Sequence, residues 1–100
     1  MKKHTHVIIT GGGRGLGLGM ALRYLKRGCN LSILNRVMTA ESTEQLDAAA
    51  QIGQAQWQFH PIEISEFEQV QAAVQKAVEQ FGAPELAINS AGVLIKGIRI

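Results

Sequence analysis

Residues 10–17 read TGGGRGLG and stand between an apolar run, Val7-Ile8-Ile9, and a segment with leucines at helical spacing, residues 18–25. Five of these eight residues are glycines. Glycine loses more backbone freedom on folding than any other residue. The cluster therefore indicates a backbone geometry, or a close neighbour, that side chains would forbid. Its position predicts a turn from a buried strand into a helix.

The rest of the chain predicts a regular alternation of strands and helices. Gly28, Gly53 and Gly82 are placed to end three helices, and Ser65 and Glu68 have the spacing of a capping box. Parallel strands need helical crossovers of this kind, so we expect one α/β domain with a parallel sheet and helices on both faces. The expected strands are 6–10, 31–34, 56–60 and 86–89, and the expected helices are 15–27, 41–52 and 65–81.

Composition excludes several classes of protein. The formal charge of +2 is small and scattered, which disfavours nucleic-acid binding. Cys29 is the single cysteine, and the three histidines have no matching carboxylates, so neither a disulfide framework nor a metal site is expected. No apolar run is long enough to cross a bilayer. We expect a cytoplasmic domain without membrane contact.

The glycine-rich loop is predicted to bind phosphate. Open α/β sheets bind nucleotides where a strand passes into a helix, because free backbone N–H groups and the helix dipole attract anions there. The P-loop pattern requires Gly-Lys, which does not occur, and G-x-G-x-x-G fails because Leu16 and Leu18 occupy its last position. The alternative is a tight turn with close helix–strand packing, which would explain two glycines but hardly five.

The loop does fit the pattern T-G-x-x-x-G-x-G, and here the sequence resembles the short-chain dehydrogenase/reductase family, in its branch with a single Rossmann-type domain. Asn89-Ser90-Ala91-Gly92 is similar to the family's N-N-A-G, and Glu63-Ile64 takes the place of its Asp-Val or Asp-Leu. The resemblance covers almost the whole chain. It implies a partial NAD(P)-binding Rossmann-type domain over residues 1–100, truncated after about four strands of a longer parallel sheet.

The resemblance also implies contacts with a nicotinamide dinucleotide. The diphosphate would face the loop, the adenine would meet the end of the third strand, and the ribose would meet the end of the fourth. Glu63 is one methylene longer than the usual aspartate, and an exposed carboxylate before a helix is an equal alternative for it. The implied contact residues are Gly11, Gly15, Leu16 and Gly17 for the diphosphate, Glu63 and Ile64 for the adenine, and Asn89, Ala91 and Gly92 near the ribose.

The end of the second strand predicts which cofactor is preferred. An acidic residue there would bind the ribose 2′-hydroxyl of NAD. The sequence has Asn35-Arg36 instead, and Arg14 lies in the loop itself. Arginine pairs with phosphate through charge-assisted hydrogen bonds. We therefore expect NADP(H) to be favoured over NAD(H), with two merely solvated arginines as the alternative.

The chemistry of the family needs a serine and a Tyr-x-x-x-Lys, which this chain does not supply. Tyr24 is its single tyrosine, and Gly28 stands four residues later. We assign no catalytic residue and no metal ligand, and expect a catalytically incomplete N-terminal fragment of an oxidoreductase acting on carbonyls or alcohols. The alternatives are a stand-alone NADP(H)-binding or regulatory module, and an interaction protein that associates with itself through an exposed sheet edge.

Overall fold

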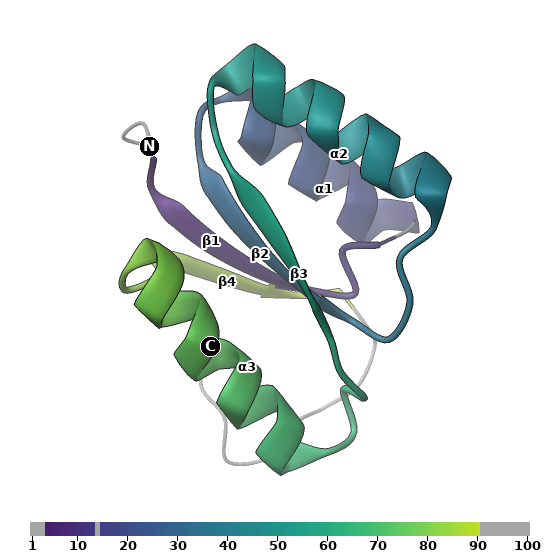
Figure 1. The fold of residues 1–100 in the computed structure, drawn as a ribbon, viewed down its shortest axis with the longest axis vertical. Helices are drawn as coiled ribbons and strands as arrows, with labels where there is room; N and C mark the ends of the chain where they lie inside the picture. The colour runs from purple at the N-terminus through teal and green to yellow at the C-terminus, as the bar shows by residue number, and fades with distance from the viewer. Residues whose placement is uncertain (1–3, 14, 91–100) are drawn as a thin grey trace.

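The computed structural model describes residues 4–13 and 15–90, which form the predicted alternation of strands and helices (Figure 1). The elements lie close to the predicted bounds. They are β1 (His6–Thr10), α1 (Gly15–Lys26), β2 (Asn30–Asn35), α2 (Ala40–Gly53), β3 (Trp57–Pro61), α3 (Phe67–Phe81) and β4 (Leu86–Asn89).

The four strands form one parallel sheet in the order β3-β2-β1-β4. Helices α1 and α2 cover one face of the sheet and α3 covers the other (Figure 1). The chain moves outward from β1 to β2 and β3, and then crosses to the far side of β1 to form β4. The predicted Rossmann-type arrangement is confirmed for these four strands. Among the described residues, no helix is both long and apolar enough to cross a membrane.

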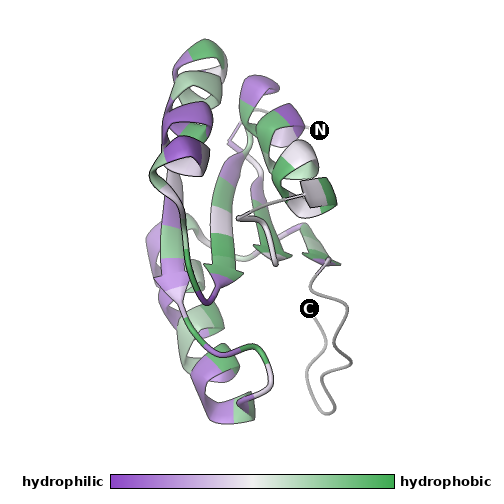
Figure 2. Cartoon of the chain, turned by 90° about the vertical axis from the view of Figure 1, so that its right-hand side faces the viewer, coloured by the Kyte–Doolittle hydropathy of each residue, from purple (hydrophilic) through white to green (hydrophobic). Residues whose placement is uncertain are grey.

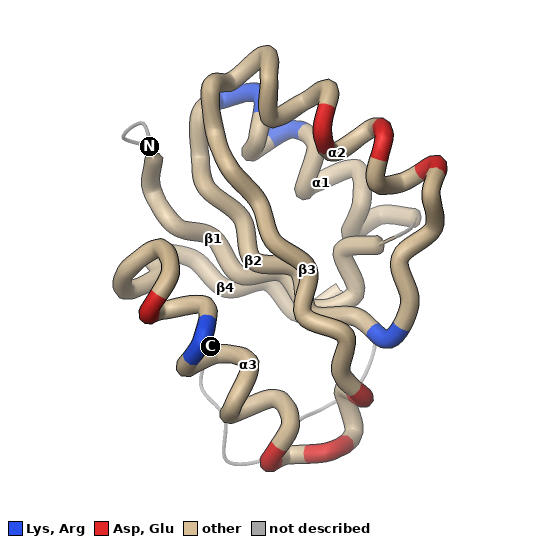
Figure 3. The backbone as a smooth tube through the Cα atoms, in the orientation of Figure 1, with Lys and Arg blue, Asp and Glu red and all other residues tan. Residues whose placement is uncertain are grey.

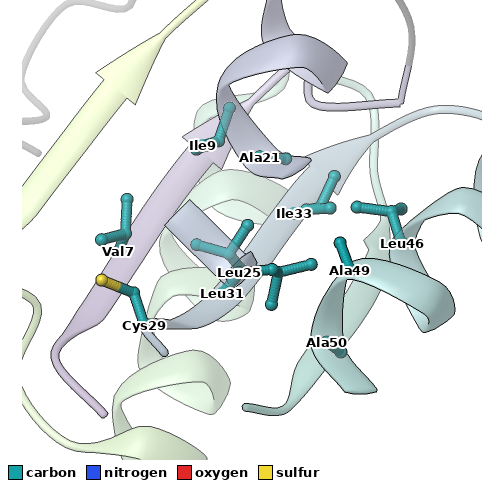
Figure 4. Close-up of a cluster of buried hydrophobic side chains, with 10 residues drawn as sticks. All are labelled: Val7, Ile9, Ala21, Leu25, Cys29, Leu31, Ile33, Leu46, Ala49 and Ala50. Atoms are coloured by element: carbon teal, nitrogen blue, oxygen red, sulfur yellow. The ribbon is translucent and has the colours of Figure 1, made fainter. Parts of the chain in front are cut away.

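Two clusters of buried side chains hold the layers together. The α1–α2 core lies between the sheet and helices α1 and α2 (Figure 4), and the α3 core lies on the opposite face. Alternate residues of β1 enter different clusters: Val7 and Ile9 enter the first, and Ile8 enters the second. A strand buried on both faces reads as a continuous apolar run, which explains the sequence before the glycine loop. Figure 2 shows hydrophobic residues gathered in the inner strands and mixed with hydrophilic ones along the helices.

The predicted role of Gly53 was wrong in its detail. Gly28 and Gly82 do take positive φ angles of 92° and 85°, as helix-ending glycines do. Gly53, however, lies inside α2, and the left-handed residue after the helix is Gln54, with φ 54°. A Cβ at position 53 would collide with the backbone oxygen of Leu25. Gly53 therefore allows α1 and α2 to approach closely.

The predicted capping box at the start of α3 is also absent. The residue that caps the helix is Glu66, and its side chain makes no capping hydrogen bond. Since the helix begins one residue later than the box requires, the Ser65 hydroxyl donates instead to Glu63 Oε1, at 3.5 Å. Phe67, the first residue of α3, is 40% exposed, whereas Val70 and Ala77 further along the helix are buried.

Candidate functional site

The loop after β1 lies at the carboxyl edge of the sheet, and two of its glycines meet separate steric demands. Gly11 has a φ of 75°, which L side chains rarely adopt, and its N–H donates to the Leu34 carbonyl at 2.8 Å. Gly17 has an ordinary backbone, but a Cβ there would collide with the Gly11 carbonyl oxygen and with Ser90 Oγ. Both glycines fold the loop back against the start of α1.

The first turn of α1 presents its backbone N–H groups beside this loop. The helix begins at Gly15 and has no acidic residue in its first turn. Leu16 is 78% exposed, so its side chain takes no part in the core. The N–H groups of a first helical turn have no partner within the helix, and without a carboxylate among them they favour an anion through hydrogen bonding and the helix dipole.

Hydrogen bonds between β1 and β4 fix the other side of the loop. The Thr10 hydroxyl donates to Asn89 Oδ1 at 2.7 Å. Ser90 donates to the Thr10 carbonyl twice, from its hydroxyl at 2.6 Å and from its backbone N–H at 3.0 Å. The strand order reverses between β1 and β4, and open α/β sheets bind ligands in the crevice at this point. Thr10, Asn89 and Ser90 thus join the carboxyl ends of β1 and β4 at this point.

A cavity of about 250 Å³ lies on the β2 side of the loop. The Asn35 side chain amide donates to the Val37 carbonyl at 2.9 Å and closes the turn after β2. A Cβ at Gly13 would strike this amide, so the loop and the turn are in close contact. The cavity is lined by Gly13, Asn35, Arg36, Val37 and Thr39.

Arg36 and Glu63, predicted for different parts of a cofactor, form an ion pair. The Arg36 guanidinium Nη1 lies 3.6 Å from Glu63 Oε2, with side chains 77% and 43% exposed. Figure 3 shows the basic position after β2 close to the acidic position after β3. Ile64 is 7% exposed and belongs to the α3 core, so its side chain faces inward.

Two residues that hold parts of the site in place were not predicted from the sequence. Buried Ser42 donates from its hydroxyl to the Gly13 carbonyl at 2.8 Å and anchors the loop to α2. Its backbone N–H bonds the Thr39 hydroxyl, the cap of α2, so the pattern T-x-x-S was a usable signal. Gln69 accepts a hydrogen bond from the Glu63 N–H at 2.9 Å, a contact between a loop and α3 that no local pattern indicated.

The structure thus brings the predicted residues of the loop, of β2, of β3 and of β4 to one edge of the sheet. Arg14, Ala91 and Gly92, which were also predicted to contact the cofactor, lie outside the described residues. Within the described ranges, no three histidine, cysteine or acidic side chains are grouped so as to hold a metal.

Burial shifts the pKa of three side chains in the described part of the chain. Burial lowers the pKa of His6, at the start of β1, and of His60, which faces α3. Burial raises the pKa of the Cys29 thiol before β2. Of these three side chains, His60 lies nearest the carboxyl edge of the sheet, since β3 ends one residue later at Pro61.

Comparison with known proteins gives a consistent result. The family model described as short chain dehydrogenase matches residues 5–99. The chain is 35% identical over 95 residues to hydroxysteroid dehydrogenase-like protein 2 of Bos taurus, covering 88% of the chain and 22% of that protein. It is 31% identical over 91 residues to L-rhamnose 1-dehydrogenase (NADP(+)) of Thermoplasma acidophilum, covering 91% and 35%.

Among solved structures, the chain resembles a putative dehydrogenase from Xanthomonas campestris. The TM-score is 0.77 at 27% identity, and the match covers 96% of this chain and 38% of that one. The chain spans between about a fifth and a third of the length of the curated relatives that it matches.

Proposed function

This chain belongs to the short-chain dehydrogenase family, and from that premise we propose that it is the cofactor-binding part of an NADP(H)-dependent oxidoreductase. The family uses nicotinamide dinucleotides. The carboxyl edge suits the doubly negative diphosphate of such a cofactor, because the first turn of α1 lies there and carries no carboxylate. When bound, the nicotinamide ring supplies the hydride. The chain's own residues bind and orient the dinucleotide.

In this proposal, residues at three places hold the cofactor. The amides of the loop and of Gly15, Leu16 and Gly17 take the diphosphate. Asn35 and Arg36 take the adenosine ribose with its 2′-phosphate, beside Glu63 and the Ile64 backbone at the adenine. The end of β4, with Asn89, lies near the second ribose. We extend the proposal to Gly11, Arg14, Ala91 and Gly92 on the resemblance alone.

The observation that carries the NADP(H) preference is the position of Arg36. Its guanidinium is largely exposed, and the residue lines the cavity next to Gly13 of the loop. β2 ends without a carboxylate that would repel a second phosphate. The Thermoplasma relative, whose name states NADP(+), supports the same preference.

A matched pair of arginine variants tests this assignment. Arg36→Gln should weaken NADPH binding by roughly tenfold or more, because hydrogen bonds to charged groups contribute about 1.5–3 kcal/mol, and should leave NADH binding nearly unchanged. Arg27→Gln removes the same charge from an exposed position after α1, at the opposite edge of the sheet. It should change neither affinity. An unchanged NADPH affinity in Arg36→Gln would contradict the assignment.

We propose further that these 100 residues bind the cofactor without reducing a carbonyl by themselves. Tyr24, the single tyrosine, packs against the α1–α2 core, and Gly28 occupies the position where the family motif has lysine. Purified chain should show no consumption of NADPH with carbonyl substrates. NADPH consumption above that of a blank without protein, from a preparation free of other reductases, would overturn this.

A single cysteine, with no disulfide within the chain, fits the cytoplasm as its location.

Self-association through β4 is a second proposal. Within residues 4–13 and 15–90, β4 pairs only with β1, and its Leu86 and Ile88 are partly exposed. Unpaired backbone groups beside such a strand can pair with another chain. Sedimentation at increasing concentration should show a dimer if the edge is used, and a monomer throughout would reject it.

A further inference from the structure

The ion pair between Arg36 and Glu63 has a consequence for cofactor selectivity. The inference that we draw from it rests on the NADP(H)-binding function proposed above. We propose that Glu63 is a selectivity-tuning residue, whose carboxylate competes with the ribose 2′-phosphate for the Arg36 guanidinium and so lowers the preference for NADP(H).

The two oxygens of the Glu63 carboxylate have different partners. Oε2 lies 3.6 Å from Arg36 Nη1. Oε1 accepts a hydrogen bond from the Ser65 hydroxyl at 3.5 Å, and the Glu63 backbone N–H is bound to Gln69 at 2.9 Å. Ser65, which precedes α3, and Gln69, which lies within it, therefore bind one oxygen and the backbone N–H of Glu63, and the other oxygen lies toward Arg36.

The length of the side chain explains why the pair forms here. The family pattern has aspartate at this position, and glutamate is longer by one methylene. Shortening the chain by one carbon–carbon bond withdraws the carboxylate by roughly 1.5 Å. The distance to Arg36 would then exceed the roughly 4 Å within which an ion pair is counted. The substitution that departs from the family pattern is thus the one that brings a negative charge to Arg36.

Arg36 is free to exchange one anion for another. Its side chain is 77% exposed, and among the described residues it forms its ion pair with Glu63. Arginine binds phosphate as well as carboxylate, through the same N–H donors. A carboxylate beside the guanidinium also repels a phosphate that approaches. Both effects oppose the binding of NADP(H), and neither acts on the uncharged 2′-hydroxyl of NAD(H).

The ratio of the NADPH and NADH affinities separates this effect from an adenine contact. A lost adenine contact would weaken both cofactors equally and leave the ratio unchanged. Glu63→Gln should instead raise the NADPH:NADH affinity ratio by up to about fivefold, the range of exposed ion pairs, and less at high salt. Glu63→Asp should raise it less, because aspartate withdraws from Arg36 but keeps the charge that repels the phosphate. Glu66→Gln, which removes a nearby exposed charge, should leave the ratio unchanged.

A double-mutant cycle measured by calorimetric titration completes the test. In an Arg36→Gln background, Glu63→Gln should raise the ratio less than in the unmodified chain, because the competition for Arg36 is absent and only the repulsion of the phosphate by the carboxylate is relieved. An unchanged ratio in the single Glu63→Gln variant overturns the inference, and so does an equal rise in both backgrounds. Equal NADPH and NADH affinities in the unmodified chain would instead refute the proposed NADP(H) preference. The smaller probes adenosine 2′,5′-bisphosphate and 5′-AMP should give the same ratios as the whole cofactors.

Discussion

Two alanine substitutions in the first turns of α1 test the steric account of the loop. Gly17 is buried, and a Cβ there would stand 3.0 Å from the Gly11 carbonyl carbon and closer to its oxygen and to Ser90 Oγ. Gly19, two residues later in the same helix, is exposed, and a Cβ there would have no neighbour within 4 Å. Both substitutions gain the same helix propensity, about 0.5–1 kcal/mol.

The two variants therefore differ by the cost of overpacking alone. That cost is typically about 1–3 kcal/mol, since the contacts involve backbone that cannot move aside cheaply. We expect Gly19→Ala to be slightly more stable than the unmodified chain, and Gly17→Ala to be less stable. Since 1 kcal/mol shifts the midpoint of a domain of this size by roughly 4–8 °C, Gly17→Ala should melt at least about 4 °C below Gly19→Ala.

Cofactor titration of the same pair separates folding from binding. Gly17→Ala displaces the Gly11 carbonyl and should weaken NADPH binding severalfold at a temperature where the variant is still folded. Gly19→Ala should bind NADPH as the unmodified chain does. The reasoning would be refuted if both variants had the same melting midpoint and the same NADPH affinity, because the close approach at Gly17 would then impose no constraint.

Two further predictions concern packing and pH. Gly53→Ala should destabilise the domain by more than about 1 kcal/mol in urea unfolding, because its Cβ would strike the Leu25 carbonyl oxygen, and a stabilised variant would contradict the packing. Burial lowers the pKa of His6 and His60, so the unfolded chain takes up protons first. The free energy of unfolding should be greatest above about pH 6.5, the ordinary pKa of histidine, and fall as the pH drops from there through the lower pKa values of the folded state. A free energy of unfolding that stays constant over this range would refute the prediction.

Much of the fold could be predicted from local sequence, because segments with helical or strand periodicity are bounded by glycines. The run Val7-Ile8-Ile9 is apolar on both faces of β1, and Gly28 and Gly82 do adopt positive φ. Local patterns failed where tertiary contacts decided the outcome. Gly53 has the position of a helix stop, but it is fixed by its contact with the Leu25 backbone on another helix.

The residues of the candidate site could be predicted from the sequence because of the topology of the sheet. In a parallel sheet the carboxyl ends of all strands meet at one edge, so residues after β1, β2, β3 and β4 gather without any long-range information. Contacts between side chains of different loops could not be predicted in this way. The ion pair of Arg36 with Glu63 and the hydrogen bond from Ser42 to Gly13 depend on how α2 and α3 pack against the sheet.

Calorimetric titration of the unmodified chain with NADPH and with NADH, at one ionic strength, tests the central claim most directly. The claim is that the glycine loop and the end of β2 form a cradle for the phosphates of NADP(H). NADPH should bind at least about tenfold more tightly than NADH, as expected for a charge-assisted contact to the 2′-phosphate. Equal affinities, or no binding of either cofactor to the folded chain, would contradict the claim.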